Sequence, residues 1–254
     1  PLDPGRPCGV PDATLRRMTN MQLALSLADL LHPIALSVDE VAYPKEIAVQ
    51  GFENNVTFAN PSPACVEAHH AATVLAARGA SGHYRTTSTC DVTSRDCARD
   101  WLLGMAERAW RRPLTTQDRT DLEGVLDRWI ASGSIDTAVA LSLQYVVMAP
   151  EFVYYPESDP PQAAPGDPLP LTDHEIAARM ASFLWNSLPD QELRALADQG
   201  ALHDRSIVAT QVWRMLSDPR AREVVSNFFR QAWEFDTIGT GNVDFRYYPR
   251  ARDS

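Results

Sequence analysis

Cysteine and histidine, side chains that hold transition metals, come closest together between residues 65 and 70 of this 254-residue sequence. Cys65 and His69 are four residues apart, so on a helix they share one face, where a thiolate and an imidazole can hold a metal with further ligands. His70 is a third candidate ligand. The alternative is that Cys65 forms a disulfide and both histidines lie on a helix surface. The sequence favours this alternative, because it has no CxxC or HxxxH spacing.

A second polar run, Glu53-Asn54-Asn55, lies between Phe52 and Phe58. Its oxygen atoms are of the kind that bind Ca²⁺ or a carbohydrate, so these three residues are candidate ligands. The competing interpretation is a structural turn, because asparagine tolerates left-handed backbone and hydrogen-bonds its own main chain. For a short run of this composition, the turn is the default.

Four cysteines stand at positions 8, 65, 90 and 97. Cys90 and Cys97 bracket a loop-like run of six residues, and a disulfide that closes it is sterically reasonable. Cys8 and Cys65 then remain as the second pair, although four cysteines allow three connectivities. An even count is compatible with an oxidising compartment, and we favour disulfides over a metal site.

Two pairs of arginines lie at the ends of predicted helices. Arg16 and Arg17 precede a capping box, where an ion pair or a loop anchor is expected. Arg111 and Arg112 precede Pro113 and end a helix, where cations complement the partial negative charge of the carboxyl end. The alternative for this second pair is a clamp that binds an anion.

Charge and missing motifs exclude several classes of protein. The chain has 23 basic and 33 acidic side chains and a net charge of −10, which argues against binding to nucleic acid. It has no GxGxxG, GxxxxGK[ST] or GxSxG motif, so neither a nucleotide site nor an α/β-hydrolase is supported. A glycosidase-type pair can exist among the carboxylates, but spacing does not reveal it. The sequence identifies no catalytic or cofactor-binding residue.

Capping signals and apolar spacing predict an all-α fold of at least eight helices with little sheet. Gly79 is expected to end the second helix, and the fifth, apolar on nearly every side, is expected at the centre. The helices are expected near 19–32, 62–78, 93–110, 115–130, 133–148, 172–185, 190–199, 204–217 and 219–236. Extended segments are expected at Ile34–Val38, Ile47–Val49 and Phe152–Tyr155. Core positions are expected for Phe183, Trp185, Trp213, Phe228, Phe229 and Trp233.

A proline-rich run divides the chain. Residues 156–170 hold six prolines in fifteen residues, and such a run is stiff and extended. We therefore expect an irregular segment at 1–12, a first helical domain at 13–155, a linker at 156–170 and a second helical domain at 171–254. Apolar runs such as Tyr145–Pro150 are far shorter than the roughly 18 residues that span a bilayer, so no transmembrane segment is expected.

Several segments, in order along the chain, resemble a bacterial family of helical domains of unknown function from planctomycetes and myxobacteria. The segments are similar to the family's LRRLT, FDNN, RRPLT, SPxFLY and LTDxELAxRxxxFLW motifs. They are Leu15–Asn20, Gly51–Asn55, Ala109–Thr115, Ala149–Tyr154, Leu171–Arg179 with Phe183–Trp185, and Met215–Ala221. Domains of this family are often fused to cytochrome c-like modules.

The resemblance implies a longer protein than the sequence at hand. Full-length relatives continue into a segment with a CxxCH motif, which resembles a c-type haem attachment site. This sequence begins at Pro1 without a methionine, ends at Ser254 and contains no CxxCH. We therefore expect a fragment or a processed chain whose signal peptide is already absent. The carboxyl-terminal remainder, with its haem c, would then be the partner, as a second chain.

Three functions are open at this point. The first, which the resemblance implies, is the amino-terminal helical part of an exported, haem-linked redox protein, such as an oxidase or oxygenase, with its chemistry largely outside this chain. The second is a non-catalytic surface or envelope module that binds a polymer or assembles with itself. The third is a hydrolase that uses carboxylates.

Overall fold

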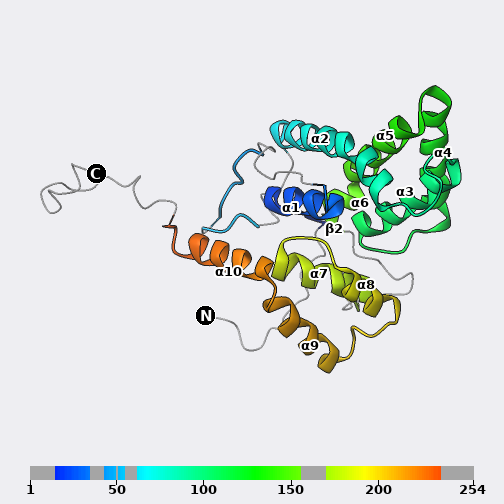
Figure 1. Cartoon of the computed structure of the whole chain (residues 1–254). Helices are drawn as coiled ribbons and strands as arrows, with labels where there is room; N and C mark the ends of the chain where they lie inside the picture. The colour runs from blue at the N-terminus through cyan, green and yellow to red at the C-terminus, as the bar shows by residue number, and fades with distance from the viewer. Residues whose placement is uncertain (1–14, 35–42, 50, 55–61, 156–169, 236–254) are drawn as a thin grey trace, which may run out of the picture.

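The computed structural model describes residues 15–34, 43–49, 51–54, 62–155 and 170–235. In these ranges the chain forms ten helices and one two-stranded antiparallel sheet, which confirms the predicted all-α fold (Figure 1). The helices are α1 Asn20–Leu31, α2 Pro63–Thr87, α3 Arg95–Trp110, α4 Thr116–Ser132, α5 Ile135–Met148, α6 Pro150–Val153, α7 Asp173–Trp185, α8 Gln191–Asp198, α9 Arg205–Leu216 and α10 Pro219–Ala232. The strands are β1 Arg16–Arg17 and β2 Tyr154–Tyr155. None of the described helices combines the length and apolar character needed to cross a membrane.

Threonine residues begin three of the helices, as predicted. The hydroxyls of Thr19, Thr115 and Thr172 each accept a hydrogen bond from the backbone N–H of the third helical residue, whose side chain accepts one from the threonine N–H. Each box gives partners to backbone groups that the first turn of a helix otherwise leaves unpaired. The start of each helix is therefore encoded locally in the sequence.

Helix α5 lies at the centre of the first part of the chain, as its apolar sequence predicts. Helices α2, α3 and α4 pack around it, and its Leu143, Val146 and Val147 are fully buried. Helix α1 packs on α2 and α3 and contributes Leu23 and Leu27 to the same hydrophobic cluster. This bundle buries one face of α1 and leaves the opposite face for other contacts.

The predicted end of the second helix at Gly79 is wrong, because α2 continues to Thr87. Gly79 and Gly82 lie inside α2, where Ile34 packs against them. A Cβ atom would lie 3.3 Å from Ile34 Cγ2 at position 79 and 3.2 Å from Ile34 Cδ1 at position 82. The two glycines therefore allow a close approach of the segment after α1, rather than a helix end.

The predicted extended segments are present only in part. Val49 forms an isolated antiparallel bridge with Phe52, with no regular strand before it. Tyr154 and Tyr155 form β2, but Phe152 and Val153 belong to the short helix α6. Residues 35–38 of the predicted Ile34–Val38 segment lie outside the described residues, and so does most of the proline-rich run.

Helices α7 to α10 have a hydrophobic cluster of their own, separate from the one around α5. Trp185 at the end of α7 is its largest member, and its indole Nε1 donates a hydrogen bond to the carbonyl of Met215, 3.0 Å away. Figure 1 shows α7 to α10 gathered on the opposite side of α1 from α2. Two clusters fit the predicted division into two helical domains, whose boundaries stay a prediction.

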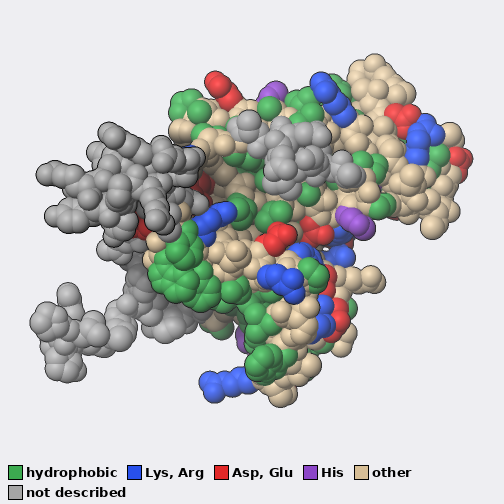
Figure 2. All heavy atoms as spheres, turned by 60° about the vertical axis from the view of Figure 1, so that its left-hand side comes forward, with side chains coloured by type: hydrophobic (Ala, Val, Ile, Leu, Met, Phe, Trp, Pro, Cys, Tyr) green, Lys and Arg blue, Asp and Glu red, His purple; other side chains and the backbone are tan. Residues whose placement is uncertain are grey.

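The expected core positions are wrong for five of the six aromatic residues. Trp185 is 1% exposed, but Phe183 and Trp213 are 78% and 72% exposed. The other three are exposed as well: Phe228 and Phe229 on α10, and Trp233 directly after it. Their rings contact one another, and Phe52 contacts Phe228 with ring centroids 5.6 Å apart. Figure 2, in which the α10 side of the molecule comes forward, shows hydrophobic side chains gathered on this side. Amphipathic spacing identified the apolar face of α10 but not whether a neighbour covers it.

Candidate functional site

His69 of the predicted metal cluster is a core residue of α2. Its Nε2 lies 2.9 Å from the carbonyl oxygen of Val147, and its Nδ1 lies 2.8 Å from the Tyr43 hydroxyl. A carbonyl only accepts, so Nε2 carries the hydrogen and Nδ1 accepts from Tyr43. Burial lowers the pKa of His69 and raises that of Tyr43, which keeps both groups neutral. Both ring nitrogens therefore have structural partners.

The other two members of the predicted metal cluster, Cys65 and His70, differ in how deeply their side chains are buried. Cys65 is half-buried near the start of α2, with its Sγ 3.9 Å from Asn20 Nδ2 of α1, whereas His70 is exposed. Within the described ranges, no group of three or more His, Cys, Asp or Glu side chains is arranged to hold a metal ion. The alternative interpretation placed both histidines on the surface, and the structure places only His70 there.

Arg17 anchors the 43–49 segment to the start of α1, as expected of an ion pair or loop anchor. Its Nη2 donates to both carboxylate oxygens of Glu46, at 2.7 and 2.9 Å, and Glu46 also accepts from the backbone N–H of Asn20. The side chains of Arg17 and Glu46 are only 4% and 10% exposed. Asn20 Nδ2 donates to the carbonyl of Pro44. The pair therefore holds Tyr43 in reach of His69.

The polar run at 53–55 follows a turn that packs against the end of α10. Gly51 has φ = 87°, in the left-handed region that glycine adopts without strain. The Glu53 N–H donates to Gln231 Oε1 at 3.2 Å, and Asn54 is exposed. Asn55, the third candidate ligand, lies outside the described residues. The described contacts fit the structural-turn interpretation.

Arg111 is a buried residue that holds backbone carbonyls. It ends α3 with φ = 58°, and its two Nη atoms donate to the carbonyls of Ala109, Glu151, Phe152 and Tyr154. Burial lowers the pKa of its guanidinium. Since these donors face carbonyls, Arg111 ties α3 to the α6–β2 segment, and the contacts do not favour an anion clamp.

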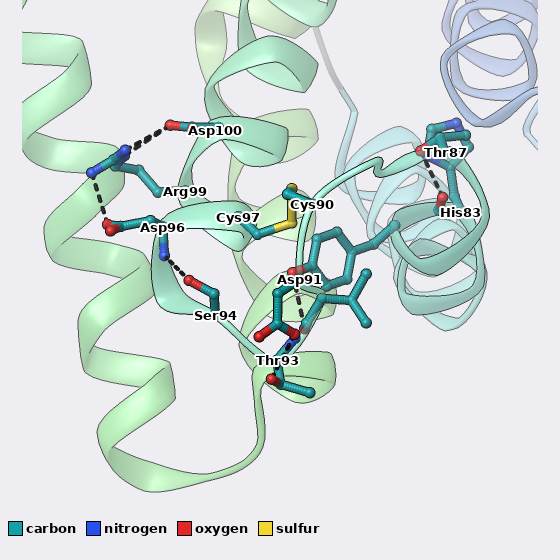
Figure 3. The surroundings of a disulfide bond; sticks show 12 residues. His83, Thr87, Cys90, Asp91, Thr93, Ser94, Asp96, Cys97, Arg99 and Asp100 are labelled. Carbon is teal, nitrogen blue, oxygen red and sulfur yellow. Dashed lines mark hydrogen bonds and ion pairs between the residues drawn. A yellow bond between two sulfur atoms is a disulfide. The ribbon is translucent and has the colours of Figure 1, made fainter.

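The predicted disulfide between Cys90 and Cys97 is present and joins the loop after α2 to the first turn of α3 (Figure 3). Asp91 Oδ1 accepts from the N–H and the hydroxyl of Thr93, which closes a tight turn inside the loop. Cys8 lies outside the described residues, and Cys65 has no disulfide partner among those that are described. The second pairing, Cys8 with Cys65, stays a prediction.

A hollow of about 350 Å³ lies beside Trp110, and carboxylates border it. Asp118, Asp121 and Glu151 line it. Arg112 donates to Asp118 at 2.6 Å and lowers the pKa of that carboxyl to about 2. A glycosidase-type acid needs a raised pKa, so Asp118 does not fit that role.

A groove of about 790 Å³ lies between α1 on one side and the end of α7 and α10 on the other. Met21, Leu25 and Ala28 of α1 form one wall. The wall opposite comes from α10 and is polar apart from Val224. It includes Arg220, Arg222, Glu223, Asn227 and Arg230. The groove therefore lies between the two hydrophobic clusters and draws its walls from both parts of the chain.

One end of the groove is closed by ionic and aromatic contacts. Arg220 has its guanidinium carbon 3.6 Å from the centroid of the Trp185 ring, and it donates to both carboxylate oxygens of Asp218. Its Nη1 also lies 3.8 Å from Asp29 Oδ2 of α1, which accepts from the hydroxyl of Ser187 at 2.9 Å. Burial by itself lowers the pKa of Arg220, but these acidic neighbours outweigh it, so the pKa of the guanidinium is raised. Together they fix the distance between α1 and α10.

Next to the groove, side-chain amides connect α1 to α7. Gln22 Nε2 donates to the hydroxyl of Ser182 at 3.1 Å and to Asn186 Oδ1 at 3.3 Å. Asn186 and Asn227 each direct an amide nitrogen at the sulfur of Met21, 3.7 and 3.8 Å away. The contact between the two parts of the chain therefore combines side-chain hydrogen bonds with the burial of Leu188 in the cluster around α5, and ligand sites lie preferentially between domains.

The amino-acid sequence alone does not reveal this groove. One signal was present, because Met21, Leu25 and Ala28 add a second apolar face to α1 beyond the leucines used in the core. The other wall comes from α10, about 200 residues further along the chain, so the spacing within α1 does not show what lies opposite this apolar face.

Two family models match the chain. Residues 97–157 match the model described as PSD5, protein of unknown function (DUF1595), and residues 171–254 match the one described as PSD4, protein of unknown function (DUF1592). No curated protein and no solved structure gives a significant match. The two matches fit the resemblance to a family of domains of unknown function. The chain therefore carries two domains of unknown function, one on each side of the proline-rich run.

Proposed function

We propose that this chain is a binding module, and that its ligand lies in the groove between α1 and α10. The observation that carries the proposal is the groove itself. Its volume of about 790 Å³ falls within the roughly 300–1,000 Å³ of ligand sites, which lie preferentially between domains. One apolar wall gives affinity by excluding water, and the polar wall gives orientation.

The contacts around the groove also support binding. Asp29, Ser187 and Arg220 hold α1 and α10 at a fixed separation through paired charges and hydrogen bonds. A site that is already open before the ligand arrives loses less conformational entropy on binding. This proposal corresponds to the non-catalytic binding module among the three functions considered from the sequence.

A groove-filling variant tests the proposal. Ala28→Trp places an indole in the groove, and Ala131→Trp puts the same side chain on an exposed position of α4 as a control. A thermal-shift screen of metabolites and glycans should give ligands that raise the Tm of the wild type and the control but not of Ala28→Trp. Ligands that stabilise all three proteins equally would overturn the proposal.

We further propose that the module belongs to an exported protein whose remainder carries a c-type haem, as a continuation of the chain or as a second chain. The resemblance supports this, and so does the Cys90–Cys97 disulfide, since disulfides persist in oxidising compartments. The 254 residues contain no CxxCH, so haem attachment of this type would lie outside them. An absorption spectrum of the full-length native protein tests this, and the absence of a Soret band and of haem in a pyridine haemochrome assay would contradict it.

A further inference from the structure

Arg108 of α3 and Arg194 of α8 bring two positive charges together where the two helical parts of the chain meet. Helix α3 belongs to the hydrophobic cluster around α5, and α8 belongs to the separate cluster around Trp185. Both arginine side chains are partly buried. Neither of them lines the groove between α1 and α10, so an inference drawn from this pair does not depend on the proposed function.

Arg108 reaches the last turn of α1 but makes only long contacts there. Its Nη1 and Nη2 donate to the backbone carbonyls of Leu30 and Asp29 at 3.4 and 3.3 Å, beyond the usual range for an N–H···O bond. Nη1 also lies 3.9 Å from the sulfur of Met105. These contacts occupy at most three of the five N–H donors of the guanidinium.

Arg194 has no hydrogen-bond or ion-pair partner among the described residues. Its Nε is buried and lacks an acceptor, which is unfavourable for any polar group and more so for a charged one. Other arginines of the second helical part are paired, since Arg214 contacts Asp190 at 2.6 Å and Arg220 contacts Asp218 at 2.9 Å. Arg194 therefore differs from these neighbours in lacking a carboxylate.

The charges around Arg108 do not cancel. Burial lowers the pKa of Arg108, the nearby guanidinium of Arg194 lowers it further, and the carboxylate of Asp29 raises it. This carboxylate is already shared, because its Oδ2 accepts from the Ser187 hydroxyl at 2.9 Å and lies 3.8 Å from Arg220 Nη1. Arg108 and Arg194 therefore keep an excess of positive charge.

We propose that Arg108 and Arg194 together bind a phosphate group, which bridges α3 and α8 and so joins the two helical parts. An anion between the two guanidiniums removes their mutual repulsion and gives acceptors to donors that have none. A carboxylate offers two oxygens in one plane, which suit a single guanidinium, whereas a phosphate group presents three or four oxygens in different directions. Its charge of about −1.5 to −2 at pH 7 also matches two arginines.

Calorimetric titration with inorganic phosphate and, separately, with glycerol 3-phosphate tests the proposal, at an ionic strength held constant with chloride. Arg108→Gln and Arg194→Gln should each weaken binding at least tenfold, since each removes a set of charge-assisted hydrogen bonds. Arg205→Gln, which changes an exposed arginine of α9, is the matched control and should bind like the wild type. Binding of both ligands supports a site for a phosphate group on a larger molecule, and binding of inorganic phosphate alone supports a site for the ion itself.

Thermal unfolding of Arg194→Gln gives a second readout. In a phosphate-free buffer its Tm should equal or exceed that of the wild type, because the change removes a like charge and a buried donor without an acceptor. Saturating phosphate should reverse the order, since it stabilises only the protein that binds it. Full phosphate affinity in Arg194→Gln, the same difference in Tm with and without phosphate, or equally tight binding of acetate would overturn the proposal.

Discussion

Arg220 lies over the indole of Trp185, with its guanidinium carbon 3.6 Å from the centroid of the ring, and this stack joins the core of the second helical part to the groove. Trp185 is buried and hydrogen-bonded to Met215, so it does not move independently of α9. Arg220 in turn contacts Asp218 and, across the groove, Asp29. The position of the α10 wall is therefore set by a residue of α7.

Replacing Arg220 should loosen the second helical part. Arg220→Ala removes a cation–π contact and two ion pairs, which for a partly exposed side chain in salt is worth about 1 kcal/mol of unfolding free energy. Arg222→Ala, two residues away and exposed, is the matched control and should be neutral. Urea denaturation followed by Trp fluorescence checks this, and equal stability of both variants would show that the stack carries no energy.

Breaking the buried Arg17–Glu46 pair should be far more costly than breaking an exposed one. Arg17→Met leaves a carboxylate that is only 10% exposed without its charged partner, and such a loss costs about 3–5 kcal/mol. Arg85→Met removes one partner of the exposed pair with Asp136 and should have a much smaller effect. Chemical denaturation of both variants is the comparison, and similar losses would contradict the account of Arg17 as an anchor.

His69 should make the fold less stable in mild acid. Burial lowers its pKa in the folded state below the ordinary value of 6.5, so the unfolded chain binds the extra proton as the pH falls through that value. Stability is therefore full above pH 6.5 and falls below it. His83, whose pKa is also lowered by burial, contributes in the same direction.

The measurement is the free energy of unfolding between pH 7.5 and pH 5. His69→Gln should be destabilised at neutral pH but lose less stability than the wild type on acidification, since one titrating group is gone. His70→Gln, which changes the exposed neighbour, should keep the slope of the wild type. An unchanged slope in His69→Gln would mean that His69 takes up a proton as readily in the folded protein as in the unfolded chain.

Removing the Cys90–Cys97 disulfide should destabilise the bundle moderately. The bond closes a short loop, with a sequence separation of 7, and the chain-entropy argument gives about 2–3 kcal/mol for a loop of this length. The paired variant Cys90→Ser, Cys97→Ser should unfold at lower urea, and reductant should shift the wild type by more than it shifts the variant, which keeps Cys8 and Cys65. A wild type that is insensitive to reductant in the unfolding transition would refute this.

Local features of the fold were predictable from the sequence, and features that depend on distant neighbours were not. Thr19, Thr115 and Thr172 mark helix starts because their capping partners are three residues away. The helix end predicted at Gly79 was wrong, because a glycine suits both a helix end and a close contact. Only the position of Ile34 distinguishes the two.

The groove likewise combines a local feature, which the sequence shows, with one that depends on a distant segment. The apolar stripe of Met21, Leu25 and Ala28 is visible in the sequence, but Arg230 faces it only because α10 returns to lie across from α1. Similarly, the spacing of Phe228 and Phe229 identifies an apolar face, and the structure was needed to show that the face is exposed. Surface patches and sites built from distant segments follow from tertiary packing, which periodicity does not encode.

The central claim, that the groove binds a ligand, is tested most directly by methyl NMR of the methionines. The chain has six, and Met21 lies in the groove while Met148 lies on α5, outside it. Titration with a ligand found in the thermal-shift screen should shift the Met21 methyl resonance in a saturable way and leave that of Met148 in place. An unperturbed Met21 resonance, at concentrations where that ligand raises the Tm of the wild type, would contradict the account.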